Sequence, residues 1–136
     1  MDIFVYGTLT DPEQVERVVH SYAFVGGAVV DGLHPVEGRY PTLAPGGEVA
    51  GRVLRTDEVD AIDRYEGVER GLYVRVELPW ADPPGPPGGA DGEGVAAYVG
   101  DPDRLGVDDV EWPGDGPFER RVRRFVADGV SVRPVD

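Results

Sequence analysis

The residue best placed for chemistry in this sequence is Glu66, near the end of a predicted helix. If the helix begins near Asp57, then Val59, Ile62 and Glu66 occur at i, i+3 and i+7 and share one face. The two apolar residues predict that this face is buried, where desolvation and the negative end of the helix dipole disfavour an ionised carboxylate. A carboxyl group with a raised pKa suits proton transfer near neutral pH. The alternative is that Glu66 lies in solvent at a frayed helix end.

Other kinds of catalytic site lack the residues that they need. The sequence contains no cysteine, which excludes disulfides, thiolate zinc sites and cysteine nucleophiles. The two histidines, His20 and His34, are isolated, so we expect no metal site. No G-x-S-x-G, Walker or G-x-G-x-x-G motif occurs. If the protein is an enzyme, acid–base chemistry by carboxylates is what remains.

The composition is strongly acidic. The 136 residues include 26 acidic and 13 basic residues, which gives a net charge of −13 and an isoelectric point near 4.4. Every basic residue is arginine. Because phosphate binding needs clustered positive charge, we expect no nucleic-acid partner for so acidic a chain. Such charge is typical of halophilic proteins, in which salt screens the repulsion, and it predicts salt-dependent folding. The alternative is a moderately acidic protein from an arginine-rich, high-GC genome.

The length and hydropathy predict a single soluble domain over residues 1–136. The mean hydropathy is −0.29, and no apolar run is long enough to cross a bilayer. We find no signal peptide before the first expected strand, so we expect a cytoplasmic protein with no membrane partner. The Pro- and Gly-rich segment 81–93 predicts an exposed loop rather than a domain boundary.

Short strands and helices must position Glu66. Strands are expected at 2–6, 22–33, 48–55, 72–78, 94–100 and 131–135, and helices at 13–20, 57–66 and 117–128. The turn at 7–9 follows the first strand, and backbone N–H groups in such a glycine turn can bind an anion. Gly67 is a suitable residue to end the helix of Glu66. Tyr73 and Arg75 share the polar face of their strand, where they either line a pocket near Glu66 or face solvent.

Two stretches together resemble the gamma-glutamylcyclotransferase-like superfamily. The first, Phe4-Val5-Tyr6-Gly7-Thr8-Leu9, is similar to the N-terminal tyrosine–glycine motif of that family. The second runs from Ile62 to Tyr73 and resembles the family's Leu/Ile-Asp-x-x-Glu-Gly stretch, with Glu66 as the glutamate. The first match stops at Thr10, and neither segment 81–93 nor the region after 101 has a counterpart that we can align.

The resemblance implies an α+β (mixed α/β) fold, built as a small closed or nearly closed β-barrel with a few flanking helices. It also implies an enzyme that cyclises a small-molecule gamma-glutamyl substrate to 5-oxoproline and a free amine. Glu66 would act as general base and then as general acid, and no cofactor is needed. By the same resemblance, the residues that bind substrate would be Tyr6, Gly7, Thr8, Leu9, Tyr73 and, on a looser match, Tyr98.

Two other interpretations remain open. The chain could be a non-catalytic module that binds a small ligand or a protein on the same fold, or it could catalyse another carboxylate-dependent amide reaction. A deep cavity with Glu66 in its wall and backbone donors opposite would favour an enzyme, whereas a filled cavity or a solvated Glu66 would favour the module. The sequence leaves the leaving group and the oligomeric state open.

Overall fold

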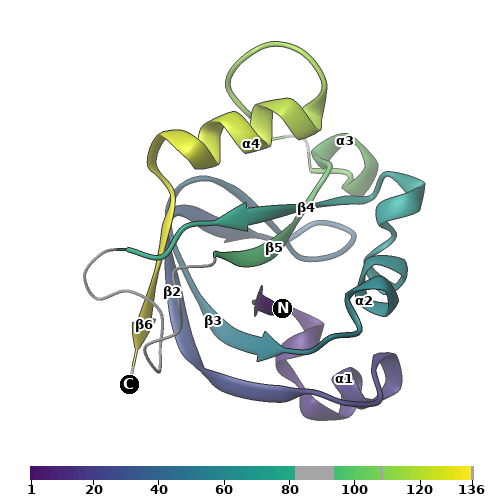
Figure 1. Cartoon of the computed structure of the whole chain (residues 1–136). Helices are drawn as coiled ribbons and strands as arrows, with labels where there is room; N and C mark the ends of the chain where they lie inside the picture. Colours follow the sequence, from purple (N-terminus) through teal and green to yellow (C-terminus); the bar gives the residue numbers. More distant parts are fainter. Residues whose placement is uncertain (82–93, 108, 136) are drawn as a thin grey trace.

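The computed structural model describes residues 1–81, 94–107 and 109–135, so the loop expected at 81–93 falls almost entirely outside the described residues. Within them, a six-stranded sheet has the order β4-β5-β1-β3-β2-β6 (Figure 1). The strands are β1 (Asp2–Val5), β2 (Ala23–Val36), β3 (Thr42–Arg55), β4 (Tyr73–Leu78), β5 (Val95–Gly100) and β6 (Ser131–Val135). The helices are α1 (Pro12–Val18), α2 (Val59–Glu66), α3 (Pro102–Leu105) and α4 (Phe118–Gly129), with 3-10 turns η1 (Thr8–Thr10) and η2 (Val68–Arg70). The mixed α+β class is as predicted.

A long antiparallel hairpin, β2–β3, forms one side of the sheet. Its register runs from Ala23 opposite Arg55 to Val36 opposite Thr42, with irregularities after Phe24 and after Asp31. The sequence predicted a shorter β3 over 48–55. The strand instead begins at Thr42, because residues 42–45 pair with the far end of β2. The hairpin therefore carries the chain past the end of β1.

β1 lies inside the sheet, antiparallel to β3 and parallel to β5. Its residues Ile3, Phe4 and Val5 are buried. Gly51 of β3 is required for this packing, because a Cβ at that position would overlap the carbonyl oxygen of Val5 and lie 2.7 Å from Cζ of Phe4. The close approach fixes the end of β1, from which the turn at 7–9 leaves the sheet.

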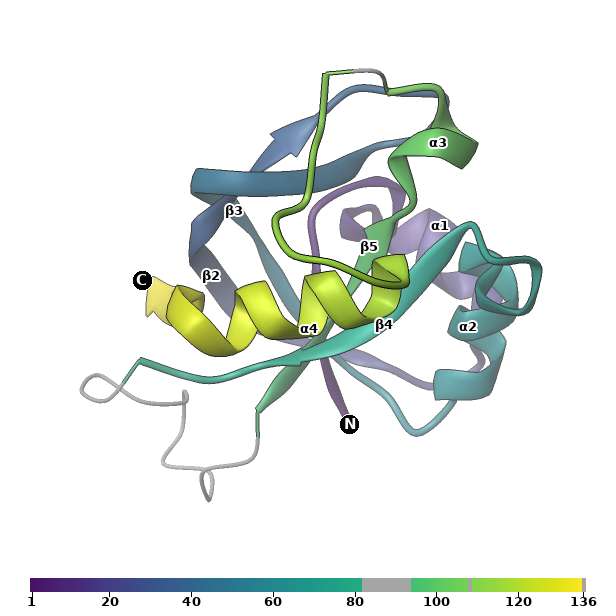
Figure 2. The same ribbon diagram turned by 90° about the horizontal axis from the view of Figure 1, so that it is seen from above.

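The prediction of a closed or nearly closed barrel is wrong. β4 and β6 are the two ends of the strand order, and what joins them in the described part of the chain is an isolated parallel bridge between Trp80 and Val132. Helix α4 packs against β4 and runs along it (Figure 2). Its Arg123 donates a hydrogen bond to the carbonyl oxygen of Arg75 in β4, at 3.3 Å. The sheet is therefore open, with a helix along one edge.

Two hydrophobic clusters hold the helices against the sheet. One lies under α4, where Trp112 packs edge-on against Phe118 and Phe125 at centroid distances of 6.1 and 5.6 Å. The other lies between β1, β5 and the helices α1 and α2, and it contains Val15 and Ile62, which are fully buried. This second cluster fixes the rotation of α2 about its axis.

The helices lie close to their expected ranges, apart from the short α3, which was not expected. α2 begins at Val59 rather than near Asp57. The carboxylate of Glu58, just before the helix, accepts hydrogen bonds from the N–H groups of His20 (2.9 Å) and Ser21 (2.7 Å). These bonds tie the start of α2 to the end of α1. None of the helices in the described ranges is long and apolar enough to cross a membrane.

Candidate functional site

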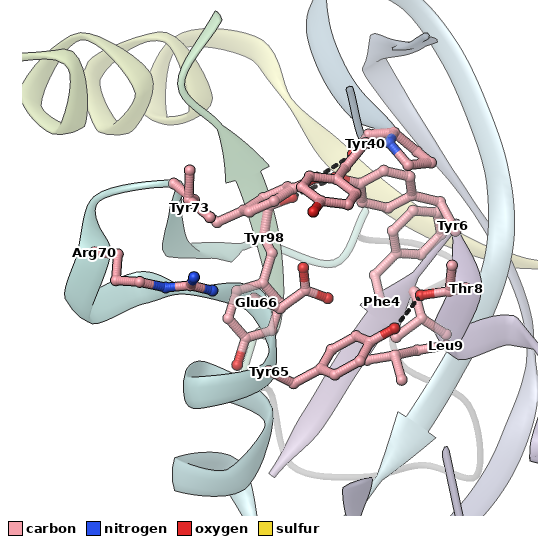
Figure 3. Close-up of a pocket in the computed structure, with 14 residues that line it drawn as sticks. Phe4, Tyr6, Thr8, Leu9, Tyr40, Tyr65, Glu66, Arg70, Tyr73 and Tyr98 are labelled. Carbon is pink, nitrogen blue, oxygen red and sulfur yellow. Dashed lines mark hydrogen bonds between the residues drawn. The ribbon is translucent and has the colours of Figure 1, made fainter. Parts of the chain in front are cut away.

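A cavity of about 280 Å³ opens beside the end of β1 (Figure 3). Its walls come from β1 and η1, from the segment just before β3, from the end of α2 with η2, and from β4 and β5. The structure brings together every residue that the sequence proposed for the site, and the cavity is lined by Tyr6, Gly7, Thr8, Leu9, Glu66, Tyr73 and Tyr98. These residues come from segments far apart in the sequence, so the site forms only where β1, β4, β5 and the end of α2 meet.

Glu66 is the last residue of α2, and Gly67 ends the helix in the left-handed conformation with φ +76°. The N–H of Gly67 donates to the carbonyl oxygen of Arg64 at 3.2 Å. Because Ile62 on the same helix face is fully buried, the last turn directs Glu66 inward. Figure 3 shows the Glu66 carboxylate pointing into the space between Tyr65 and Tyr73.

The Glu66 carboxylate has no hydrogen bond or ion pair with any residue that the structure describes. Burial raises the pKa of this carboxyl from 4.5 to about 7. Close to neutral pH the acid and the carboxylate are therefore both populated. A group that must take up a proton and then return it needs this balance.

The three predicted tyrosines form neutral walls of the cavity, because burial raises the pKa of each above its ordinary value. Their hydroxyl groups donate to other parts of the protein. Tyr6 donates to the carbonyl oxygen of Tyr98 at 2.5 Å, and Tyr73 donates to that of Pro41 at 2.5 Å. Tyr98 donates to the carboxylate of Asp63 at 2.6 Å. The tyrosines thus offer a bound molecule mainly their rings.

Asp63 holds α2 against the sheet, a role that the sequence analysis missed. Its carboxylate accepts from Tyr98 of β5 and forms an ion pair with Arg75 of β4 at 2.8 Å. Arg75 therefore does not line the cavity. No local pattern pointed to the contact with Tyr98, because it joins side chains 35 residues apart in the sequence.

Tyr65, Arg70 and Tyr40 also line the cavity and were not proposed from the sequence. The Tyr65 hydroxyl lies 2.8 Å from Oγ1 of Thr8 and so links α2 to the turn after β1. Tyr40 is 52% exposed at the cavity. Tyr65 and Arg70 lie close to Glu66 in the sequence, and this proximity could have identified them as residues that line the cavity.

The histidines lie away from the cavity. His20 contacts Glu58 at 3.1 Å, and Nδ1 of His34 lies 3.0 Å from the carbonyl oxygen of Gly46. Among the residues with described positions, no three histidine, aspartate or glutamate side chains gather as metal ligands would. The chemistry available in the cavity is therefore that of one carboxyl group, backbone donors, tyrosine rings and one guanidinium group.

Comparison of the sequence with known proteins gives a match over most of the chain. The family model described as "Gamma-glutamyl cyclotransferase, AIG2-like" matches residues 3–113. The AIG2-like protein C of Arabidopsis thaliana is 40% identical over an alignment of 76 residues, and the match covers 50% of this chain and 44% of that protein. The match thus spans less than half of the length of this relative.

Comparison of the structure gives the same result for the fold. A solved structure described as a gamma-glutamyl cyclotransferase has a TM-score of 0.59 and 16% identity, covering 95% of this chain and 99% of that one. The solution structure of an Arabidopsis thaliana protein has a TM-score of 0.56 and 26% identity, covering 90% and 80%. The first likeness, at such low identity, shows a shared fold.

Proposed function

Because this chain belongs to the family of AIG2-like gamma-glutamyl cyclotransferases, we propose that it cyclises a gamma-glutamyl compound to 5-oxoproline and a free amine. The observation that carries the proposal is the Glu66 carboxyl, which has no partner among the described residues and a pKa of about 7, in the wall of a cavity that Gly7, Thr8 and Leu9 also line. An open cavity with such a group supports an enzyme better than a non-catalytic module.

Glu66 would move one proton in each half of the reaction. The substrate's alpha-amine is protonated near neutral pH, and its nitrogen can attack the gamma-carbonyl carbon only after a proton has passed to the Glu66 carboxylate. The new C–N bond closes the five-membered ring. Glu66 then returns the proton to the leaving nitrogen as the original amide C–N bond breaks, and the second proton, which the ring nitrogen carries after the attack, passes to the released amine, so that the products are the neutral lactam and an ammonium group. Atoms and charge balance with no other reactant.

The turn after β1 would supply the backbone donors. The first N–H groups of a helical turn such as η1 have no partner within that turn. The turn itself is fixed, because the backbone N–H and the Oγ1 of Thr10 both donate to the carbonyl oxygen of Gly7, at 3.1 and 2.7 Å. We assign the N–H groups of Gly7, Thr8 and Leu9 to the substrate carboxylate or to the oxyanion that forms on the attacked carbonyl.

The tyrosine walls would hold the substrate in a folded conformation. The reaction is intramolecular, so much of its acceleration comes from orienting the amine toward the carbonyl. Tyr6, Tyr73 and Tyr98 are suited to this task, because their hydroxyl bonds fix the rings and their neutral state avoids repelling a carboxylate substrate.

The test is the release of 5-oxoproline, in molar salt, from gamma-glutamyl amino acids, gamma-glutamyl amines and glutathione. Glu66→Gln keeps the shape of the side chain but cannot take up the proton, so we expect kcat/KM to fall by about 10²- to 10⁴-fold. In the wild type, kcat/KM should fall about tenfold per pH unit below a pH of about 7, because the attacking amine needs the ionised Glu66.

Glu69→Gln is the matched control. Glu69 is exposed on η2, three residues from Glu66, and does not line the cavity, so this variant should keep wild-type turnover. Circular dichroism would check that all variants are folded. Folded wild-type protein that releases 5-oxoproline from no substrate of the panel would contradict the proposal and leave the ligand-binding module as the better explanation.

A further inference from the structure

Arg70 is a cation at the cavity that the proposed reaction does not use. It is the last residue of η2, its side chain is exposed, and it lines the same cavity as Glu66. No carboxylate of the described residues forms an ion pair with it. Of the described residues that line the cavity, only Arg70 and Glu66 have side chains that carry a charge near neutral pH.

The backbone of Arg70 is held close to Glu66 by the turn between them. The backbone N–H of Arg70 donates to the carbonyl oxygen of Gly67 at 3.1 Å, which closes the turn between the two residues. The guanidinium passes over that turn, since a Cβ on Gly67 would lie 3.0 Å from Nη2 of Arg70. Figure 3 shows the side chain extending toward Glu66 from the side opposite Thr8 and Leu9.

The charge of the whole chain makes this position distinctive. At a net charge of −13, the molecule repels anions. A second carboxylate, on the leaving group rather than on the glutamyl end, therefore gains most from a local cation. A guanidinium offers two parallel N–H donors, which match the two oxygens of a carboxylate.

We propose that Arg70 binds a carboxylate on the leaving group, so that the preferred substrate is a gamma-glutamyl amino acid rather than a neutral gamma-glutamyl amine. The inference rests on the proposed function. With the glutamyl end at the turn of residues 7–9 and the scissile nitrogen at Glu66, the leaving group extends toward Arg70. When the leaving group is an amino acid joined through its alpha-nitrogen, its carboxyl carbon lies two bonds from the leaving nitrogen. Its carboxylate is then close enough to contact a guanidinium beside Glu66.

The test compares gamma-glutamyl-L-alanine with gamma-glutamyl-L-alaninamide, which has the same shape but no charge on its leaving group. We expect the ratio of their kcat/KM values to fall about 10- to 100-fold in Arg70→Gln relative to wild type, the size of a lost charge-assisted hydrogen bond. Comparing ratios between the two proteins cancels the different reactivity of the two leaving groups. The ratio for Arg70→Lys should lie between the ratios for wild type and Arg70→Gln, because lysine keeps the charge but loses the paired donors.

Arg104→Gln is the control for a general change of charge. The Arg104 guanidinium lies near Gly71, with Cζ 3.6 Å from a Cβ built there, but it does not line the cavity, so this variant should keep the wild-type ratio. A ratio that is equal in wild type and Arg70→Gln would overturn the role of Arg70 and leave the cyclotransferase proposal standing. Folded wild-type protein that turns over neither compound, nor any other gamma-glutamyl compound, would overturn both.

Discussion

In the proposed reaction, Glu66 must be buried enough to hold a proton near neutral pH, yet open enough to meet a substrate. The structure meets both needs by ending α2 at the cavity and by leaving the carboxyl without a partner among the described residues. An ion pair with Arg70 would lower the pKa of Glu66 and weaken it as a base. The two side chains instead share the cavity without an ion pair, so each is available to a different part of a substrate.

The burial of Glu66 without a partner among the described residues predicts that its ionisation lowers the free energy of unfolding, and that Glu66→Gln removes this loss. The pKa of Glu66 is about 7 in the folded protein against 4.5 as the ordinary value. Between these values the folded state binds more protons than the unfolded state, so the contribution of Glu66 to the free energy of unfolding falls as pH rises from 4.5 through 7. We expect Glu66→Gln to raise the free energy of unfolding by about 1–3 kcal/mol at pH 8 and by almost nothing at pH 4.

Urea unfolding of both proteins at the two pH values measures this difference. Glu69→Gln again serves as control, because its carboxyl is exposed on η2 and its replacement should change little at either pH. A gain that is the same at pH 4 and pH 8 would show that the amide packs better for reasons unrelated to ionisation, and would contradict the proposed burial cost.

At the scale of elements, the contact between β3 and β1 sets the position of the turn that carries Gly7. Gly51→Ala should lower the free energy of unfolding by about 2–3 kcal/mol, because the added methyl meets the backbone of Val5, which cannot move without shifting the strand. We also expect lower activity in the protein that remains folded, since the end of β1 leads into the site. Thermal unfolding and 5-oxoproline release measure the two effects.

Gly129→Ala is the control for the loss of a glycine as such. Gly129 ends α4, and nothing lies within 4 Å of a Cβ built there. This substitution should be neutral or stabilise the protein by up to about 1 kcal/mol. If Gly51→Ala proved as stable as Gly129→Ala, the close approach between β3 and β1 would not be a structural requirement.

The elements that local patterns could predict are those whose ends are marked by their own residues. The helix of Glu66 is one, because Gly67 ends it and Ile62 marks its buried face. The full length of β3 could not be predicted, since its first residues resemble a turn and are extended only by pairing with β2. The same holds for the Asp63 contact with Tyr98, which joins side chains 35 residues apart.

The open sheet was also beyond prediction from local sequence. Whether β4 and β6 pair depends on where α4 packs, and α4 packs along β4 through Arg123 and its buried apolar residues. The family resemblance led to the right class of fold but overstated the closure. Tertiary packing, rather than the pattern within any strand, decides this feature.

At the scale of the whole molecule, the net charge of −13 predicts that stability depends on salt. We expect the urea midpoint at pH 7 to rise by about 1 M between 0.1 and 2 M NaCl, equal to about 1–3 kcal/mol at typical denaturant slopes. Near pH 4.4, the isoelectric point, the same salt change should have a much smaller effect, because the net charge is close to zero. Midpoints that do not move with salt, or that move equally at both pH values, would contradict the halophilic interpretation.

The hydrogen bond from Tyr6 to the backbone of Tyr98 spans 92 residues, and β1 pairs in parallel with β5 beside it. Contacts of such long range form slowly, because much of the chain must be ordered before they can close. We therefore expect the wall of the cavity to be among the last parts of the molecule to form during folding. A partly folded chain can contain the β2–β3 hairpin and α2 and still have nowhere to bind a substrate. The rate at which catalytic activity returns during refolding would then measure the rate of the last folding step.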